Sequence, residues 1–231
     1  MTVESVFDEL VAEYPVWWID ALGEHNHVGG VEATRWLMAR ARLRPGARVL
    51  DAGAFVGATA RLLAAEAGVR AVATDVNGDF LAAGRSMEHG GLVEWVVAAN
   101  QRLPFADGAF ESVWCLDSAL APKEFTRVAA VGATLCLCCE VPVDGRGGTE
   151  SFLEEWEALG WRLLAHRSMS FEATEAWRKA EHLLVRFRPR YEERYGKRGY
   201  VFALDTLADL VRAYEFGERG HALLVLEKVR A

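Results

Sequence analysis

The sequence predicts an α/β fold in which a mostly parallel sheet carries helices on both faces. Short apolar segments alternate with helical segments over residues 47–143, as expected of successive β-α-β units. The first apolar segment runs into a glycine-rich turn that leads directly into a helix. Hydrophobic residues make up 52% of the 231 residues, which is enough for a large buried core.

The central zone supplies five of the expected strands. Each is a short apolar run that leads into a helix or a turn, and most are bounded by glycine or aspartate. Periodic apolar residues between the strands predict crossover helices, and right-handed crossovers place these helices on both faces. The expected strands are 48–50, 69–74, 93–97, 110–116 and 133–141, and the expected helices are 56–67 and 80–88.

Helical segments flank this zone, and together they predict one domain. Residues 1–43 form an N-terminal helical cap, 44–148 the core, and 149–231 a C-terminal part with a covering insertion at about 171–200. The cap contains an aromatic cluster and a loop over residues 25–30. The flanking elements expected are helices 31–43, 151–159, 171–195 (interrupted at Pro189) and 204–214, and strands 161–168 and 221–229.

Charge and hydropathy exclude several partners. Thirty-three acidic and 26 basic residues give a net charge of −7, and an acidic chain repels nucleic acid. The basic run from Arg35 to Arg48 is interpreted as a solvated helix face. No segment approaches the roughly 20 apolar residues of a membrane span. The first ten residues lack the order of a signal peptide, so we expect a cytoplasmic protein without membrane contact.

All four cysteines lie in apolar runs that are expected to form strands. Successive strand residues face opposite sides, so Cys136 and Cys138 share a face while Cys139 points away. This spacing does not match a zinc site, which needs four convergent ligands. We therefore expect reduced, buried thiols and no metal.

The strongest local feature is the turn Asp51-Ala52-Gly53-Ala54-Phe55-Val56-Gly57. Glycine allows unusual backbone dihedrals and close approach to a ligand, and the helix start behind it offers N–H donors. Asp75 ends the second expected strand, 24 residues after Asp51, where a carboxylate can accept hydrogen bonds from both hydroxyls of a ribose. The two features together predict a nucleotide-type site.

With the run LPFADGAFE at residues 103–111, these features resemble the small-molecule (type 11-like) branch of class I S-adenosylmethionine-dependent methyltransferases. The resemblance covers residues 45–142 well and the C-terminal order more loosely. It implies a Rossmann-like sheet of seven strands, with the last strand antiparallel beside the sixth. It also implies S-adenosylmethionine as cofactor and a small-molecule methyl acceptor. The loop 25–30 is similar to one in enzymes that methylate sterols, tocopherols, methylated glycines and natural products.

The resemblance also implies roles for individual residues, and the chain departs from the family at two of them. Phe55 replaces a usual glycine, and Ala99 replaces a frequent aspartate, which leaves adenine recognition to Asn100. The connection after Asp117 is short and lacks a common histidine. The cofactor residues implied are Asp51, Ala52, Gly53, Ala54, Phe55 and Gly57 at the methionine side, Asp75 at the ribose, Val76, Asn77, Asn100 and Gln101 at the adenine, and Asp117, with Ser118, beside the transferred methyl.

Methyl transfer is an in-line displacement in which the protein mainly positions the reactants and excludes water. A general base is needed only if the acceptor must lose a proton. His25 and His27 are candidates for that base, or alternatively they hydrogen-bond backbone or a cofactor carboxylate. Candidate walls of the acceptor pocket, or alternatively core residues, are Tyr14, Trp17, Trp18 and Trp177. The acceptor atom (oxygen, nitrogen, carbon or sulfur) and the choice between monomer and homodimer stay open.

Two other functions are compatible with parts of this pattern. A nicotinamide-dependent oxidoreductase also uses a glycine turn and a strand-end aspartate, but here the glycines are spaced Gly53-x-x-x-Gly57 rather than GxGxxG. A non-catalytic relative that only binds the cofactor is the second alternative, because Phe55 and Ala99 depart from the usual site.

Overall fold

The computed structural model describes residues 16–88, 90–143 and 149–230. They form a seven-stranded sheet in the order β3-β2-β1-β4-β5-β7-β6. Strand β7 is antiparallel to both of its neighbours, whereas the other pairs are parallel, which confirms the predicted topology. The strands are β1 (Arg48–Ala52), β2 (Arg70–Asp75), β3 (Val93–Val97), β4 (Phe110–Leu116), β5 (Ala129–Pro142), β6 (Trp161–Ser168) and β7 (Arg219–Lys228).

The described helices are α2 (Val16–Leu22), α3 (Gly30–Met38), α4 (Ala58–Ala67), α5 (Gly78–Met87), α6 (Pro122–Val128), α7 (Glu150–Ala158), α8 (Ser170–Arg186) and α9 (Arg188–Glu215). Two of the predicted helices were wrong in their extent. Helix α3 ends at Met38 rather than at residue 43. The expected interruption of the long C-terminal helix near Pro189 is confirmed: the break falls at Phe187, and Pro189 occupies the first turn of the next helix, where proline is favoured. The expected separate helix 204–214 is the end of α9, which is kinked at Gly196.

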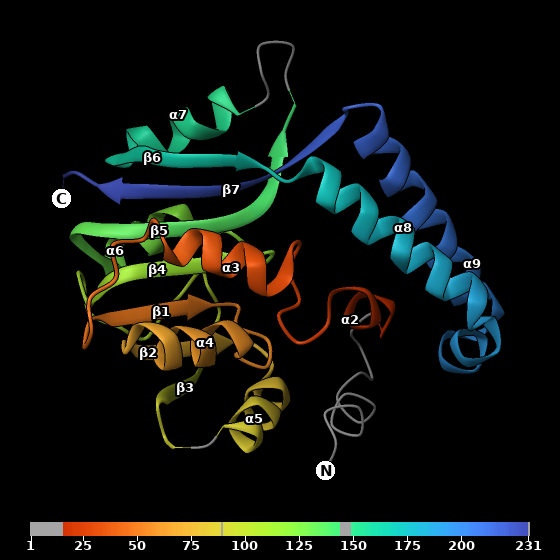
Figure 1. Ribbon diagram of the computed structural model, residues 1–231, viewed down its shortest axis with the longest axis horizontal. Coiled ribbons are helices and arrows are strands. Elements are labelled where there is room, and N and C mark those ends of the chain that lie inside the picture. Colours follow the sequence, from red (N-terminus) through yellow and green to blue (C-terminus); the bar gives the residue numbers. More distant parts are fainter. Residues whose placement is uncertain (1–15, 89, 144–148, 231) are drawn as a thin grey trace.

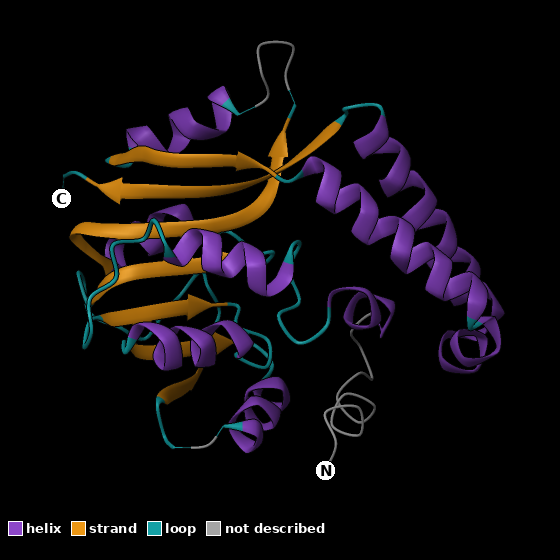
Figure 2. Cartoon of the chain, viewed as in Figure 1, coloured by secondary structure: helices purple, strands orange, loops and turns teal. Residues whose placement is uncertain are grey.

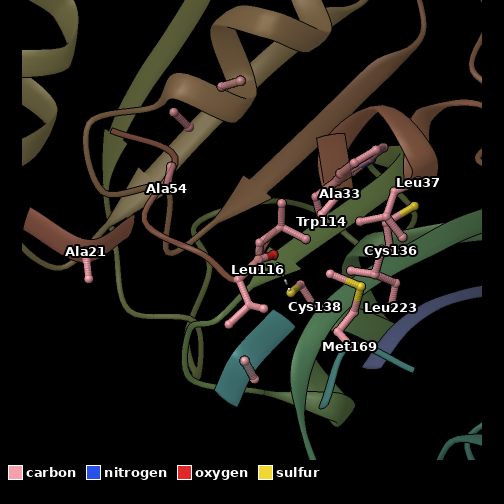
Figure 3. Packing of buried hydrophobic residues seen from close by; sticks show 14 of the residues in the cluster. Ala21, Ala33, Leu37, Ala54, Trp114, Leu116, Cys136, Cys138, Met169 and Leu223 are labelled. Carbon is pink, nitrogen blue, oxygen red and sulfur yellow. Dashed lines mark hydrogen bonds between the residues drawn. The ribbon is translucent and has the colours of Figure 1, made fainter. Parts of the chain in front are cut away.

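Alternating strand residues build a core on each face of the sheet. One face packs against α3 and α4, with Leu37 and Leu63 on the helices and Trp114, Cys136 and Cys138 on the strands. Figure 3 shows part of this packing, including both cysteines and Leu37. The opposite core contains Cys115 and Cys139 and is covered by α6 and α7. All four cysteines are free and buried, as predicted from the strand alternation.

The run at residues 103–111 is fastened to α6 by one arginine. The Arg127 guanidinium donates to the carbonyl oxygens of Phe105 (2.7 Å) and Leu103 (3.0 Å). It also forms ion pairs with Asp107 (2.8 Å) and Glu124 (2.7 Å). The run therefore shapes the link between β3 and β4, and Gly108 takes a positive φ in it.

Helices α8 and α9 form a hairpin, here called the arm, that projects beyond the sheet (Figures 1 and 2). It lies on the side at which β1 ends, and α2 packs against α8. The arm thus borders the carboxyl edge of the sheet, where open α/β folds bind their ligands. Within the described ranges, no helix is both long and apolar enough to cross a membrane.

Candidate functional site

A cavity of about 350 Å³ opens at the carboxyl ends of β1, β2 and β4. Its walls come from the glycine turn, the start of α5, the loop before α3, and the segments that follow β3 and β4. The lining residues are His25, Asn26, Gly53, Phe55, Asp75, Val76, Asn77, Phe80, Ala98, Asn100, Gln101, Leu116, Asp117, Ser118 and Ala119.

Two glycines are required by the shape of the turn. Gly53 and Gly57 have φ values of 74° and 66°, a region that disfavours side chains. A Cβ at Gly53 would lie 1.8 Å from the Ser118 hydroxyl oxygen. A Cβ at Gly57 would lie 2.5 Å from the Trp95 ring. The turn can therefore lie against its neighbours only when both positions lack side chains.

The N–H groups of the turn are already used inside the protein. Gly53 and Ala54 both donate to the Thr74 carbonyl at 2.8 Å, and Gly57 donates to the Ala54 carbonyl at 2.7 Å. Phe55 donates to Asp75 Oδ2 at 2.9 Å. Dinucleotide sites use such N–H groups to hold a pyrophosphate. This turn has them engaged elsewhere, which argues against the nicotinamide alternative.

Asp75 is held in a fixed orientation at the end of β2. Its Oδ1 accepts from the Asn77 N–H at 2.9 Å, and its Oδ2 accepts from Phe55. Burial raises the pKa of Asp75, and the backbone N–H groups of Asn77, Phe55 and Val76 oppose that rise. Each carboxylate oxygen can accept a further hydrogen bond, so Asp75 can still receive the hydroxyls of a ribose.

Phe55, which departs from the family pattern, forms a wall of the cavity and does not fill it. Its backbone has a φ of 54°, and its side chain is 4% exposed. The ring packs edge-on against Phe80, with centroids 4.6 Å apart, in a cluster that includes Ile19 of α2. Ala99, the other departure, does not line the cavity, whereas Asn100 does and donates to the Ala119 carbonyl at 2.8 Å.

Asp51 lies beneath the turn rather than in the cavity wall. Its Oδ2 accepts from the Ala60 N–H at 3.0 Å, which ties β1 to the first turn of α4. Burial raises the pKa of Asp51 to about 7, and the charge of Asp75 adds to this effect. Three further predicted cofactor residues, Ala52, Ala54 and Gly57, also lie outside the wall. The other eight line it: Gly53, Phe55, Asp75, Val76, Asn77, Asn100, Gln101 and Asp117.

The two candidate bases occupy different environments. His25 lines the cavity, and its buried Nδ1 has no hydrogen-bond partner among the described residues. Burial lowers the pKa of His25, and the nearby arginines Arg61 and Arg35 lower it further, against the opposing charge of Glu24. His25 is therefore neutral at pH 7 and able to accept a proton.

His27 is not among the residues that line the cavity, and both of its ring nitrogens lie within hydrogen-bond distance of protein atoms. Its Nε2 is 2.9 Å from the Thr34 hydroxyl, and its Nδ1 is 3.1 Å from the Val28 carbonyl oxygen. Burial lowers the pKa of His27 to about 4. These contacts favour the structural alternative for His27.

Asp117 lines the cavity and has an unusual backbone conformation. It has a φ of 49°, and its N–H donates to the Cys138 carbonyl at 2.7 Å. Its Oδ2 accepts from the Val28 N–H at 2.8 Å, and its Oδ1 is 3.0 Å from His221 Nε2. Burial by itself would raise the pKa of Asp117, but His221 and the Val28 N–H lower it below its usual value.

Several site residues were missed from the sequence. His221 belongs to β7 and has no local motif, so only the folded sheet brings it to Asp117. Asn26 lies in a loop that the sequence singled out, and Phe80 opens the predicted helix after β2, so both had a usable signal. The remaining residues missed in the wall are Ala98, Leu116 and Ala119.

The predicted aromatic walls are not among the lining residues. Trp17 and Trp177 are buried, 8% and 2% exposed. The Trp18 and Trp177 rings lie 4.6 Å apart between α2 and α8. Tyr14 lies outside the described residues. Of the predicted acceptor residues, Ser118 lines the cavity, so contact of the tryptophans with an acceptor stays a prediction.

Comparison with known proteins agrees with this geometry. Residues 49–134, which contain the turn, Asp75 and Asp117, match the family model described as a methyltransferase domain. The match covers 86 of the 231 residues and marks a methyltransferase domain in this part of the chain. No curated protein matches the sequence.

Solved structures share the fold of this chain at low identity, among them the following three. A putative sarcosine dimethylglycine methyltransferase from Galdieria sulphuraria has a TM-score of 0.84 and 14% identity, over 97% of this chain and 99% of that one. The [4+2]-cyclase SpnF has a TM-score of 0.74 and 22% identity, over 87% and 81%. A phosphoethanolamine N-methyltransferase from Haemonchus contortus has a TM-score of 0.74 and 15% identity, over 97% of this chain but only 60% of that one.

S-adenosylmethionine is the cofactor of the methyltransferase family, and the cavity residues fit it. The Asp75 carboxylate would accept hydrogen bonds from the hydroxyls of a ribose, and the apolar rings of Phe55 and Phe80 line the same cavity. Asp75 and Asp117 give the described wall two carboxylates, and it contains no lysine or arginine. Such a wall suits a sulfonium cation and disfavours a ligand with phosphate groups.

Proposed function

We propose that this methyltransferase methylates a small nucleophile that is neutral or positively charged, and that His25 accepts the proton which the acceptor loses. One observation carries the proposal. The described cavity wall combines two carboxylates with a neutral imidazole and has no lysine or arginine side chain.

The charge of the wall selects the acceptor. A carboxylate or phosphate on the acceptor would be repelled by Asp75 and Asp117 and would find no guanidinium or ammonium partner. An amine, by contrast, is attracted to these carboxylates in its protonated form. It must then lose a proton before its nitrogen can react, and this gives His25 a function. The N-methyltransferase from Haemonchus contortus likewise acts on nitrogen according to its name.

Each residue then has a defined part in the reaction. S-adenosylmethionine supplies the methyl group and a neutral thioether leaving group. His25 takes the proton of the acceptor on a ring nitrogen, and Asp117 stabilises positive charge on the acceptor. Phe55, Phe80 and Leu116 exclude water from the cavity. Positioning and desolvation therefore account for most of the rate that the protein contributes.

The test is the formation of S-adenosylhomocysteine with a panel of small amines, phenols, thiols, carboxylates and phosphate esters. We expect turnover with amines or neutral acceptors. His25→Asn should lower kcat by about 10²- to 10⁴-fold, the usual contribution of a general base, and should leave S-adenosylhomocysteine affinity nearly unchanged. The matched control is His166→Asn, because His166 is exposed on β6. A preference for anionic acceptors, or full activity in His25→Asn, would contradict the proposal.

A further inference from the structure

We infer that His221 and Tyr214 are positioning residues for methyl transfer, and that they act through Asp117 on the loop that carries His25. This inference rests on the proposed function, since it gives His25 its purpose. None of the sequence motifs points to either residue.

A continuous chain of buried hydrogen bonds joins the arm to the cavity. The Tyr214 hydroxyl is 3.1 Å from His221 Nδ1, and His221 Nε2 is 3.0 Å from Asp117 Oδ1. The other carboxylate oxygen of Asp117 accepts from the Val28 N–H at 2.8 Å. With an ionised Asp117, the Nε2–H of His221 donates to the carboxylate and the tyrosine hydroxyl donates to Nδ1. Both ring nitrogens are then satisfied, and the orientation of the imidazole is fixed.

The backbone of His221 also joins the arm to the sheet. Its N–H donates to the Ser170 hydroxyl at 3.1 Å, and its carbonyl accepts from the Met169 N–H at 2.7 Å. Ser170 begins α8, and Tyr214 lies near the end of α9. A displacement of either arm helix would therefore disturb the imidazole and, through it, Asp117.

Asp117 connects His221 to the loop that lines the cavity. Its positive φ is uncommon for a residue with a side chain, and such conformations persist where the surroundings fix them, often at active sites. The Val28 N–H that it holds lies three residues after His25, which lines the same cavity. A wrongly placed Asp117 would release this loop and with it the proposed base. An error of about 1 Å in such a group can cost about 100-fold in rate.

Cys138 completes the buried cluster. Its Sγ lies 3.4 Å from His221 Nε2, 3.7 Å from Asp117 Oδ2 and 3.6 Å from the Val28 carbonyl oxygen. Ligand atoms of Asp117, Cys138 and His221 lie within 4.8 Å of one another, a spacing that could hold a metal ion. Each of these atoms already has a hydrogen-bond partner, however, and burial raises the pKa of the thiol well above its usual value. We therefore assign the cluster as a hydrogen-bonded network, and metal analysis is part of its test.

The charges around Asp117 predict how its titration responds to substitution. His221 on β7 and His27 in the loop favour its ionised form, whereas burial opposes it. The other titratable groups near it are Tyr214 on α9, Cys115 on β4, and Cys138 and Cys139 on β5. Loss of the imidazole leaves the burial effect less opposed, so the pKa of Asp117 should rise. The contribution of the ionised Asp117 carboxylate is present above that pKa and is lost as the pH falls through it.

The experiment compares His221→Leu with His221→Gln, whose amide N–H can still donate to Asp117. We expect His221→Leu to lower kcat by at least about 10-fold, to change S-adenosylhomocysteine affinity by less than about 3-fold, and to move the acid limb of the pH–rate profile to higher pH. His221→Gln should recover most of the rate and return the limb toward that of the parent. Tyr214→Phe should give a smaller loss of the same kind. His166→Leu, on the exposed part of β6, is the control.

Four results would overturn the inference. The first two are an unchanged kcat in His221→Leu and an equal loss of kcat in His221→Gln and His221→Leu. The third is a loss of S-adenosylhomocysteine affinity that parallels the loss of kcat. The fourth is one equivalent of bound zinc in the parent protein that is absent from Cys138→Ser. Hydrogen exchange of the Val28 amide gives a readout that needs no acceptor. It should speed up in His221→Leu but not in His221→Gln. If the parent enzyme forms no product with any acceptor but this difference is seen, the proposed function fails while the network stands.

Discussion

The glycine turn after β1 and Asp117 after β4 both line one cavity, but the contacts that hold them are built differently. The turn is held by contacts between residues close in the sequence, such as Phe55 with Asp75 and Asp51 with Ala60, which are 20 and 9 residues apart. The network joins Asp117 to Val28, 89 residues away, and to His221 on β7. The turn depends on backbone shape and the network on buried charge. We therefore expect damage to the turn to change cofactor affinity, and damage to the network to change turnover.

The largest effect is expected at Gly53. In Gly53→Ala the new Cβ would collide with Ser118, and the backbone would be strained as well. S-adenosylhomocysteine affinity should fall by about 100-fold or more, since the turn must move to relieve the collision. Isothermal titration calorimetry measures this. Gly132→Ala is the matched control, because Gly132 has a φ of 82° with no atoms near its Cβ position. If the affinity in Gly53→Ala is unchanged, the turn is not the steric determinant described here.

A smaller effect on affinity is expected at Asp75. Asp75→Asn keeps the size of the side chain, but its amide NH₂ is a donor and would face either the Phe55 N–H or the Asn77 N–H, which are donors too. A lost hydrogen bond to a charged group is equivalent to about 10- to 100-fold in affinity. Asp117→Asn should instead lower kcat with little change in that affinity. The control is Asp79→Asn on the exposed side of α5. Equal effects of the two variants on affinity would remove the distinction between the regions.

The smallest effect concerns stability, and it is expected at Asp51. Burial raises the pKa of this carboxyl to about 7, so the folded state favours the protonated form. Its contribution to stability is complete below the unfolded pKa and declines as the pH rises from about 4 to about 7. Asp51→Asn keeps the acceptor for the Ala60 N–H but cannot ionise. The unfolding free energy of this variant, minus that of the parent protein, should therefore increase over that pH range. Urea denaturation at about pH 5 and about pH 8 measures it, and a constant difference would contradict the raised pKa.

The fold and most of the cavity lining were predictable because their signals are local. Strands 93–97, 110–116 and 161–168 agree with β3, β4 and β6 to the residue, since apolar runs bounded by turn residues define them. Gly53 and Asp75 were predictable because a strand–turn–helix unit places them at one edge of the sheet. The helix break near Pro189 was predicted, but its position at Phe187 was not, because Pro189 is compatible with either the end or the start of a helix.

The two histidines show where sequence reasoning stops. His25 and His27 belong to one short loop and were equal candidates for the base, but burial and contacts with Thr34 and Val28 separate them in the fold. Phe55 is a similar case. The sequence does not say whether its ring points into the cavity, where it would collide with a cofactor. The packing against Phe80 decides the direction of the ring.

The sequence by itself determined the α/β class, the glycine turn and the carboxylate at the end of β2, because chain-local sterics and hydrophobic periodicity specify them. Only the tertiary structure decided that His221 meets Asp117, that Tyr214 of the arm supports the imidazole, and that His25 alone of the two candidate bases lines the cavity. These contacts join segments as far apart as β4 and β7. Their geometry follows from sheet order and side-chain packing, which no short stretch of sequence encodes.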